Sequence, residues 1–115
     1  KIYKVAELSA NAQPMTVQGN SQTRFNMLGS AITIGERLLV ADTVNGRVLG
    51  WDSVADAANG KNPTLILGAT DLSETVPEIG RDKLYWPSDM NFDGTYLWVG
   101  EFKFSVRLLR FGLPK

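Results

Sequence analysis

Four carboxylates are the residues of this chain with the clearest capacity for chemistry. Each lies at the end of a short strand-like run: Asp42, Asp89, Asp93 and Glu101. Carboxylate oxygens suit a hard divalent cation such as Ca²⁺, and two carboxylates can also act as a general acid and base pair. One hypothesis is therefore a share of an enzyme, hydrolase-like or lyase-like, in which Asp42, Asp89 and Glu101 surround a divalent metal. Asp93 precedes a glycine and is better explained as a turn residue.

The composition narrows the chemistry further. The 115 residues include no cysteine and no histidine. This excludes thiolate catalysis, disulfides, Cys- or His-ligated zinc and the Ser-His-Asp triad. Together with the absence of a nucleophile motif, it favours a binding or scaffolding role without catalysis, and no cofactor apart from the metal of the alternative hypothesis.

Charge and hydropathy bear on partners and location. Twelve basic and twelve acidic residues give no net charge, so nucleic acid is not an expected partner. No apolar run approaches the length that crosses a bilayer. The sequence favours a soluble protein and leaves its compartment open, with secretion and a periplasmic location both compatible.

Aromatic residues of the second half are the candidates for binding: Tyr85, Trp86, Tyr96 and Trp98. Their flat faces suit sugars, peptides and nucleobases, and they can equally pack between repeated units. Strand alternation predicts that Tyr96 and Trp98 share one face of a sheet, with Leu97 and Val99 on the other.

Two short polar segments predict turns. Asn45-Gly46 is a strong hairpin signal, because both residues tolerate the positive φ of a type I′ turn. Asp93-Gly94 predicts a second hairpin. Beside the first, Asp42 can accept hydrogen bonds from nearby backbone amides and Arg47 can reach a carboxylate or carbonyl across strands, so this polar group is predicted to have a structural role.

The elements that position these residues occur twice. The segment LLVADTVNGRVLGW (38–51) returns in altered form as LWVGEFKFSVRLLRF (97–111), with Val40 and Val99 59 residues apart. Asp42 then corresponds to Glu101, and Arg47 to Arg107 once one inserted residue is allowed. A period of this length, built from short strands, indicates a propeller or another repeat array.

The predicted elements are short strands separated by turn residues. In the first copy we expect strands over 30–34, 37–42, 47–51 and 64–69, with one helical turn over 54–58 capped by Asp52 or Ser53. In the second copy we expect strands over 88–92, 95–101 and 105–111. Four consecutive antiparallel strands make a propeller blade, so the predicted fold class is all-β, with about two blades.

Several of these residues resemble a known family. VADTVNGRVLGW is similar to the NHL repeat of β-propellers, and PTLILGATDL followed by LYWPSDMNFDGTYLWV resembles its extended bacterial version. The resemblance implies the last strands of a preceding blade in 1–27, a complete blade in 28–70, and a connection with most of a second blade in 71–115. Some NHL propellers bind RNA, but the neutral charge argues against RNA here.

Two blades are fewer than a stable array needs, because a blade cannot bury both of its faces alone and about three units are generally required. We therefore expect self-association or further blades of the same polypeptide. Three copies would supply nearly the residues of a six-bladed propeller, and a fragment of a longer propeller is the other possibility. The expected ligand is a protein or a small molecule.

Overall fold

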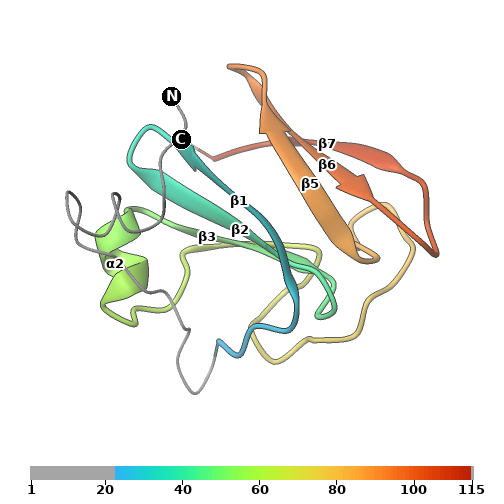
Figure 1. Cartoon of the computed structure of the whole chain (residues 1–115), viewed down its shortest axis with the longest axis horizontal. Coiled ribbons are helices and arrows are strands. Elements are labelled where there is room, and N and C mark those ends of the chain that lie inside the picture. Colours follow the sequence, from blue (N-terminus) through green and yellow to red (C-terminus); the bar gives the residue numbers. More distant parts are fainter. Residues whose placement is uncertain (1–22, 115) are drawn as a thin grey trace, which may run out of the picture.

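Two antiparallel sheets make up nearly all of the regular secondary structure in the computed structural model, which describes residues 23–114 (Figure 1). The first sheet, sheet 1, has the order β1-β2-β3-β4 and the second, sheet 2, the order β5-β6-β7. The strands are β1 (Leu28–Ile34), β2 (Arg37–Asp42), β3 (Arg47–Trp51), β4 (Leu65–Leu67), β5 (Pro87–Phe92), β6 (Tyr96–Glu101) and β7 (Leu108–Gly112). The all-β fold class is thus confirmed, and each sheet is a meander.

One short helix interrupts the strands, α2 (Val54–Ala58). The Ser53 hydroxyl accepts a hydrogen bond from the Asp56 amide at 3.1 Å and so caps its first turn. This confirms the predicted helical turn and selects Ser53 over Asp52 as the cap. Within residues 23–114, no helix is long and apolar enough to span a membrane.

Five of the seven predicted strands differ at their ends from those observed, and two of them differ most. The strand expected over 105–111 begins only at Leu108. The preceding residues Ser105 and Arg107 belong to a loop, where their side chains donate hydrogen bonds to Glu101 at the end of β6. The strand expected over 64–69 is limited to Leu65–Leu67, where it pairs with β3. The predicted segment 1–27 lies outside the described residues, except for 23–27.

The first predicted hairpin has a different turn from a type I′ turn. Asp42 and Arg47 are the last paired residues, so the loop contains four residues and the Gly46 amide donates to the Thr43 carbonyl at 3.0 Å. Gly46 has a φ of 67°, whereas Asn45 lacks a positive φ. The Asn45 amide group instead donates to Asp42 Oδ2 at 2.9 Å, a side-chain bond that helps to hold the longer loop.

The second predicted hairpin is shifted by one residue. The Asp93 amide donates to the Tyr96 carbonyl, which leaves Gly94 and Thr95 as the turn residues. Asp93 Oδ1 accepts hydrogen bonds from the amides of Thr95 and Tyr96 at 2.8 and 2.7 Å. The Asp93 carboxylate, which directly precedes the turn residues, therefore stabilises the turn.

The sequence repeat is also a structural repeat. Met27 and Trp86, which lie 59 residues apart, have positive φ angles of 54° and 51°. Directly after each, the pairing of the first strand shifts register, between Leu28 and Ala31 and between Pro87 and Asp89. In both sheets, a residue with positive φ precedes the first strand, and the pairing of that strand shifts register. Two sheets of unrelated origin would not be expected to share both irregularities.

The two sheets pack face to face around the main core. Sheet 1 contributes Leu39, Ala41 and Val48, and sheet 2 contributes Met90, Leu97 and Val99. Leu97 and Val99 are fully buried while Tyr96 and Trp98 are half-buried on the opposite face, which confirms the predicted alternation. On its other face, sheet 1 has a second core, built of Leu38, Val40, Leu49 and Trp51 with Ala57 of α2. Figure 1 shows α2 beyond sheet 1, on the side away from sheet 2.

Candidate functional site

One end of the molecule joins the two sheets and carries the loops of both copies. The Thr43 hydroxyl, just after β2, donates a buried hydrogen bond to the Pro87 carbonyl at the start of β5 (2.7 Å). Gly29 allows this approach, because a Cβ at its position would lie 2.6 Å from Thr43 Oγ1 and 3.0 Å from the Ser88 Cα. The ends of β2 and β6 and the starts of β1, β3, β5 and β7 meet here.

In the first copy, a buried ion pair organises this end. Asp42 Oδ2 accepts from Arg47 Nε at 2.8 Å, and both side chains are at most 1% exposed. Asp42 Oδ1 accepts from the Asn26 amide at 2.7 Å. The Arg47 guanidinium also donates to the Leu72 carbonyl, and the Asn45 side chain to the Arg24 carbonyl, each at 2.7 Å. Asp42, Asn45 and Arg47 thus connect three separate segments of the chain.

In the second copy, Glu101 and Arg107 take the same places. Glu101 Oε1 accepts from Arg107 Nε at 2.6 Å and from the Ser105 hydroxyl at 2.7 Å. Glu101 Oε2 accepts from Arg107 Nη2 and from the Tyr85 amide, which corresponds to the Asn26 amide of the first copy. Burial raises the pKa of Glu101, but hydrogen bonds from Arg107, Tyr85 and Ser105 outweigh burial and hold this pKa below its ordinary value.

These ion pairs bear on the metal hypothesis. Asp42 and Glu101 each bind their own arginine, and Asp89 is exposed on β5. In the part of the chain that the structure describes, no three His, Cys, Asp or Glu residues are grouped so that they could hold a metal ion. The structure therefore does not bring Asp42, Asp89 and Glu101 together as a Ca²⁺ site.

Four aromatic side chains next to Glu101 or to the amide that it binds form a cluster, which we call the aromatic cluster: Tyr85, Trp86, Phe102 and Phe104. The ring centroids of Trp86 lie 5.8 Å from Phe102 and 5.3 Å from Phe104. Tyr85 stacks beside Trp86 at 6.4 Å and meets Phe104 edge-on at 5.9 Å. Phe102 and Phe104 are 42% and 58% exposed, so the cluster is a surface feature rather than part of the core.

A tight turn places the two phenylalanines. The Phe104 amide donates to the Phe102 carbonyl at 2.9 Å, with Lys103 between them at a φ of 69°. A three-residue turn around a positive φ is rare and strained for a side-chain-bearing residue. The turn at Lys103 accommodates the one residue that is inserted between Glu101 and Arg107 in the second copy. The Lys103 ammonium lies 5.2 Å from the ring centroids of both Trp86 and Phe104.

The other two predicted aromatics form a separate group on the outer face of sheet 2. The Arg110 guanidinium carbon lies 4.3 Å from the Tyr96 ring centroid and 5.9 Å from that of Trp98. Trp98 Nε1 donates to Asp93 Oδ2 at 2.8 Å. This bond, followed by those from the Tyr96 and Thr95 amides, lowers the pKa of Asp93. Trp86 directly precedes β5, whereas Tyr96 follows the hairpin at the other end of β5. The four predicted aromatics therefore belong to two surfaces.

Sequence reasoning missed Phe102, Lys103 and Phe104 as site residues. A signal was present in the repeat, since aromatic residues replace smaller ones at corresponding positions. Tyr85 and Trp86 correspond to Asn26 and Met27, and FKF occupies the place of Thr43-Val44. One end of a single copy has thus become aromatic.

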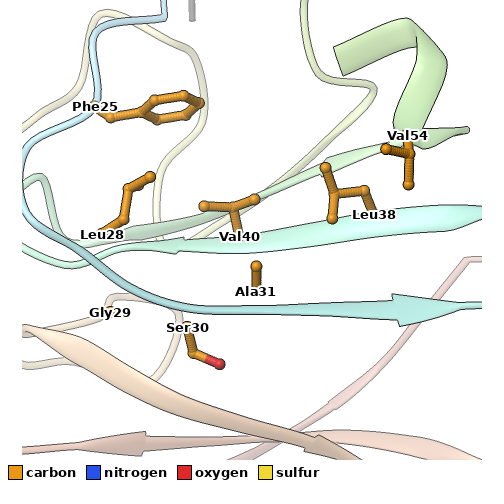
Figure 2. A pocket seen from close by; sticks show the side chains of 8 residues that line it. All are labelled: Phe25, Leu28, Gly29, Ser30, Ala31, Leu38, Val40 and Val54. Atoms are coloured by element: carbon orange, nitrogen blue, oxygen red, sulfur yellow. The ribbon is translucent and has the colours of Figure 1, made fainter. Parts of the chain in front are cut away.

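A second surface feature is an apolar hollow of about 400 Å³ on the outer face of sheet 1. Figure 2 shows the side chains of Phe25, Leu28, Leu38, Val40 and Val54 directed into one space between the strands and α2. Ser30 points the other way, toward sheet 2. The hollow contains apolar surface and little that could orient a polar ligand.

In comparisons with known proteins, no family model, curated protein or solved structure matches the chain.

Proposed function

We propose that this chain is a non-catalytic binding module made of two successive blades of an NHL-type β-propeller, and that it binds its ligand through the aromatic cluster. The observation that carries the proposed binding function is the exposed aromatic cluster itself. Large aromatic side chains gathered at a surface provide contact area at low conformational cost. Here the Tyr85 amide donates to the buried Glu101 carboxylate, and Phe102 directly follows Glu101, so these two residues are held in place before a ligand arrives.

The way in which the sheets pack supports the propeller. Leu97 and Val99 face sheet 1, and their equivalents Leu38 and Val40 face away from sheet 2. The two copies therefore use opposite faces to contact each other, in a head-to-tail arrangement. If the arrangement continued, a further sheet would pack on the outer face of each sheet, as in successive blades.

The two outer faces differ in character. The outer face of sheet 1 is partly covered by α2, which packs on the second core, and the apolar hollow lies beside it. On sheet 2, Asn91, Trp98 and Arg110 replace Ile32, Leu39 and Gly50 of the corresponding face of sheet 1. A polar outer face is typical of a terminal repeat, whereas an apolar one needs a neighbour. We infer that the next sheet packs on sheet 1, and that a second copy supplies it in a solution of this chain alone.

Replacing Ala31 with glutamate is expected to weaken self-association by at least about tenfold, because a charge would be buried without a partner. Ala31 is exposed and lines the apolar hollow, so the change should leave the fold intact. Light scattering over a range of concentrations measures the effect. Val76→Glu, at a 73% exposed position of the connection between the sheets, is the matched control and should behave as the original chain does. An original chain that is monomeric at every concentration would contradict the proposal.

The proposed binding function is tested by nuclear magnetic resonance with four small probes: methyl glucoside, adenosine, choline and acetyl-tyrosine amide. At least one probe is expected to shift the Trp86 indole resonance in a saturable manner. Trp86→Ala and Phe104→Leu should remove saturable binding, whereas Trp98→Leu should retain it because Trp98 belongs to the other surface. If no probe shifts residues of the aromatic cluster, the proposed function is wrong.

The enzyme hypothesis has less support than binding. Its carboxylates are spread over the sheets, and two of the three are held by arginine. A general base or metal ligand must be free to accept a proton or a cation, and these two carboxylates already accept several hydrogen bonds.

A further inference from the structure

The aromatic cluster already contains a cation, the ammonium group of Lys103. Lys103 Nζ is equidistant from the Trp86 and Phe104 ring centroids, at 5.2 Å. A cation within about 6 Å of a ring face is attracted by the negative potential of that face. Among residues 23–114, no Asp or Glu lies within ion-pair distance of this ammonium. The rings are therefore its partners.

The Lys103 side chain is free to move away from the aromatic rings. Lys103 is exposed, and its long stem rotates freely compared with the rings. Its backbone has a positive φ in a three-residue turn whose flanking residues are Phe102 and Phe104. The same turn thus places both phenyl rings beside Trp86 and the lysine ammonium over the rings of Trp86 and Phe104. Exposed cation–π contacts are weak, so a better cation can displace the lysine.

We propose that the aromatic cluster is a binding site for a quaternary ammonium group, and that Lys103 occupies this site as an internal competitor in the absence of ligand. This inference rests on the proposed binding function. A quaternary ammonium has a full positive charge and an apolar surface, and it sheds water more readily than a lysine ammonium does. Two or more rings around one cation are the arrangement that recognises such groups.

The group has two possible sources, a free small molecule or a trimethylated lysine side chain of a partner. Both present the same trimethylammonium head to the rings. Choline and acetyl-trimethyllysine-amide are the two probes that separate these sources. If both bind, the ratio of their dissociation constants shows which stem fits beside Tyr85 and Phe102.

The experiment is a titration of the full chain followed by tryptophan fluorescence and by the Trp86 indole resonance. Choline or the trimethyllysine derivative is expected to bind with a dissociation constant in the millimolar range or tighter. The neutral isostere 3,3-dimethylbutan-1-ol has the same shape without the charge and should bind at least about tenfold more weakly than choline.

Three variants complete the design. Lys103→Gln removes the competitor and is expected to tighten binding of the cation by about threefold to tenfold. Phe104→Leu keeps an apolar side chain but removes one ring, and it should abolish saturable binding. Trp98→Leu alters the other aromatic surface and should leave the dissociation constant unchanged. Circular dichroism establishes that each variant is folded.

Each result decides between clear alternatives. Equal binding of choline and its neutral isostere, or weaker cation binding by Lys103→Gln, would overturn the proposed site. If neither cation binds but methyl glucoside, adenosine or acetyl-tyrosine amide shifts the cluster, the inference is wrong and the proposed function stands. If no probe shifts the cluster, both are wrong.

Discussion

Replacing Arg47 with leucine should lower the free energy of unfolding by about 3–5 kcal/mol, the cost of leaving one partner of a buried ion pair alone. The Asp42 carboxylate would keep its bonds from the Asn26 amide and from Asn45. Its negative charge would nevertheless have no cation and no access to water, because Asp42 and Arg47 are both almost completely buried. Urea unfolding followed by far-ultraviolet circular dichroism measures the change.

The second copy provides the matched control. Arg107→Leu removes the corresponding arginine, but the Arg107 side chain is 30% exposed, so its removal admits water to the Glu101 carboxylate. We expect a loss about half as large as for Arg47→Leu. If the two variants were equally stable, burial would not be the reason for the effect at Arg47.

Replacing Gly46 with alanine is the second substitution with a large expected effect, a loss of about 3 kcal/mol. Gly46 has a φ of 67°, where an L side chain is strained. A Cβ at Gly46 would also lie 2.6 Å from the Pro77 Cα and 2.9 Å from the Leu84 carbonyl oxygen. Both contacts are with backbone, so the connection between the sheets would have to move.

Gly35→Ala separates backbone strain from the steric clash. Gly35 has a similar φ of 62°, but no atom lies within 4 Å of a Cβ placed there. This variant should lose only about 1 kcal/mol, the cost of the left-handed conformation alone. The same unfolding measurement applies to both glycines. Equal losses at the two positions would show that the Pro77 and Leu84 contacts are absorbed without cost.

Local chemistry explains which features the sequence predicts correctly. Strand alternation around Trp98 and the Ser53 cap depend on neighbouring residues, and both are confirmed. Turn types are predicted less well, because the side chains of Asn45 and Asp93 bond within their loops. The first loop is longer than expected, with four residues, and the second turn is shifted by one residue.

The aromatic cluster was only half predicted, for a different reason. Tyr85 and Trp86 are candidates because of their residue types. Phe102 and Phe104 are brought beside them by a turn at Lys103, which no local sequence pattern predicts. That turn follows from a one-residue insertion beside a buried carboxylate. Its geometry depends on contacts between residues far apart in the chain, which a single sequence does not specify.

The segment between the two sheets has little regular structure, yet both arginines of the repeat bind it. Arg47 donates to the carbonyl of Leu72, and Arg107 donates to the carbonyls of Gly80 and Lys83. Detaching this segment would deprive two guanidinium groups of their acceptors at once, one in each sheet. The loss of either sheet would in turn release the segment that the other requires. The two sheets are thereby coupled thermodynamically, and they should unfold as one cooperative unit rather than one after the other.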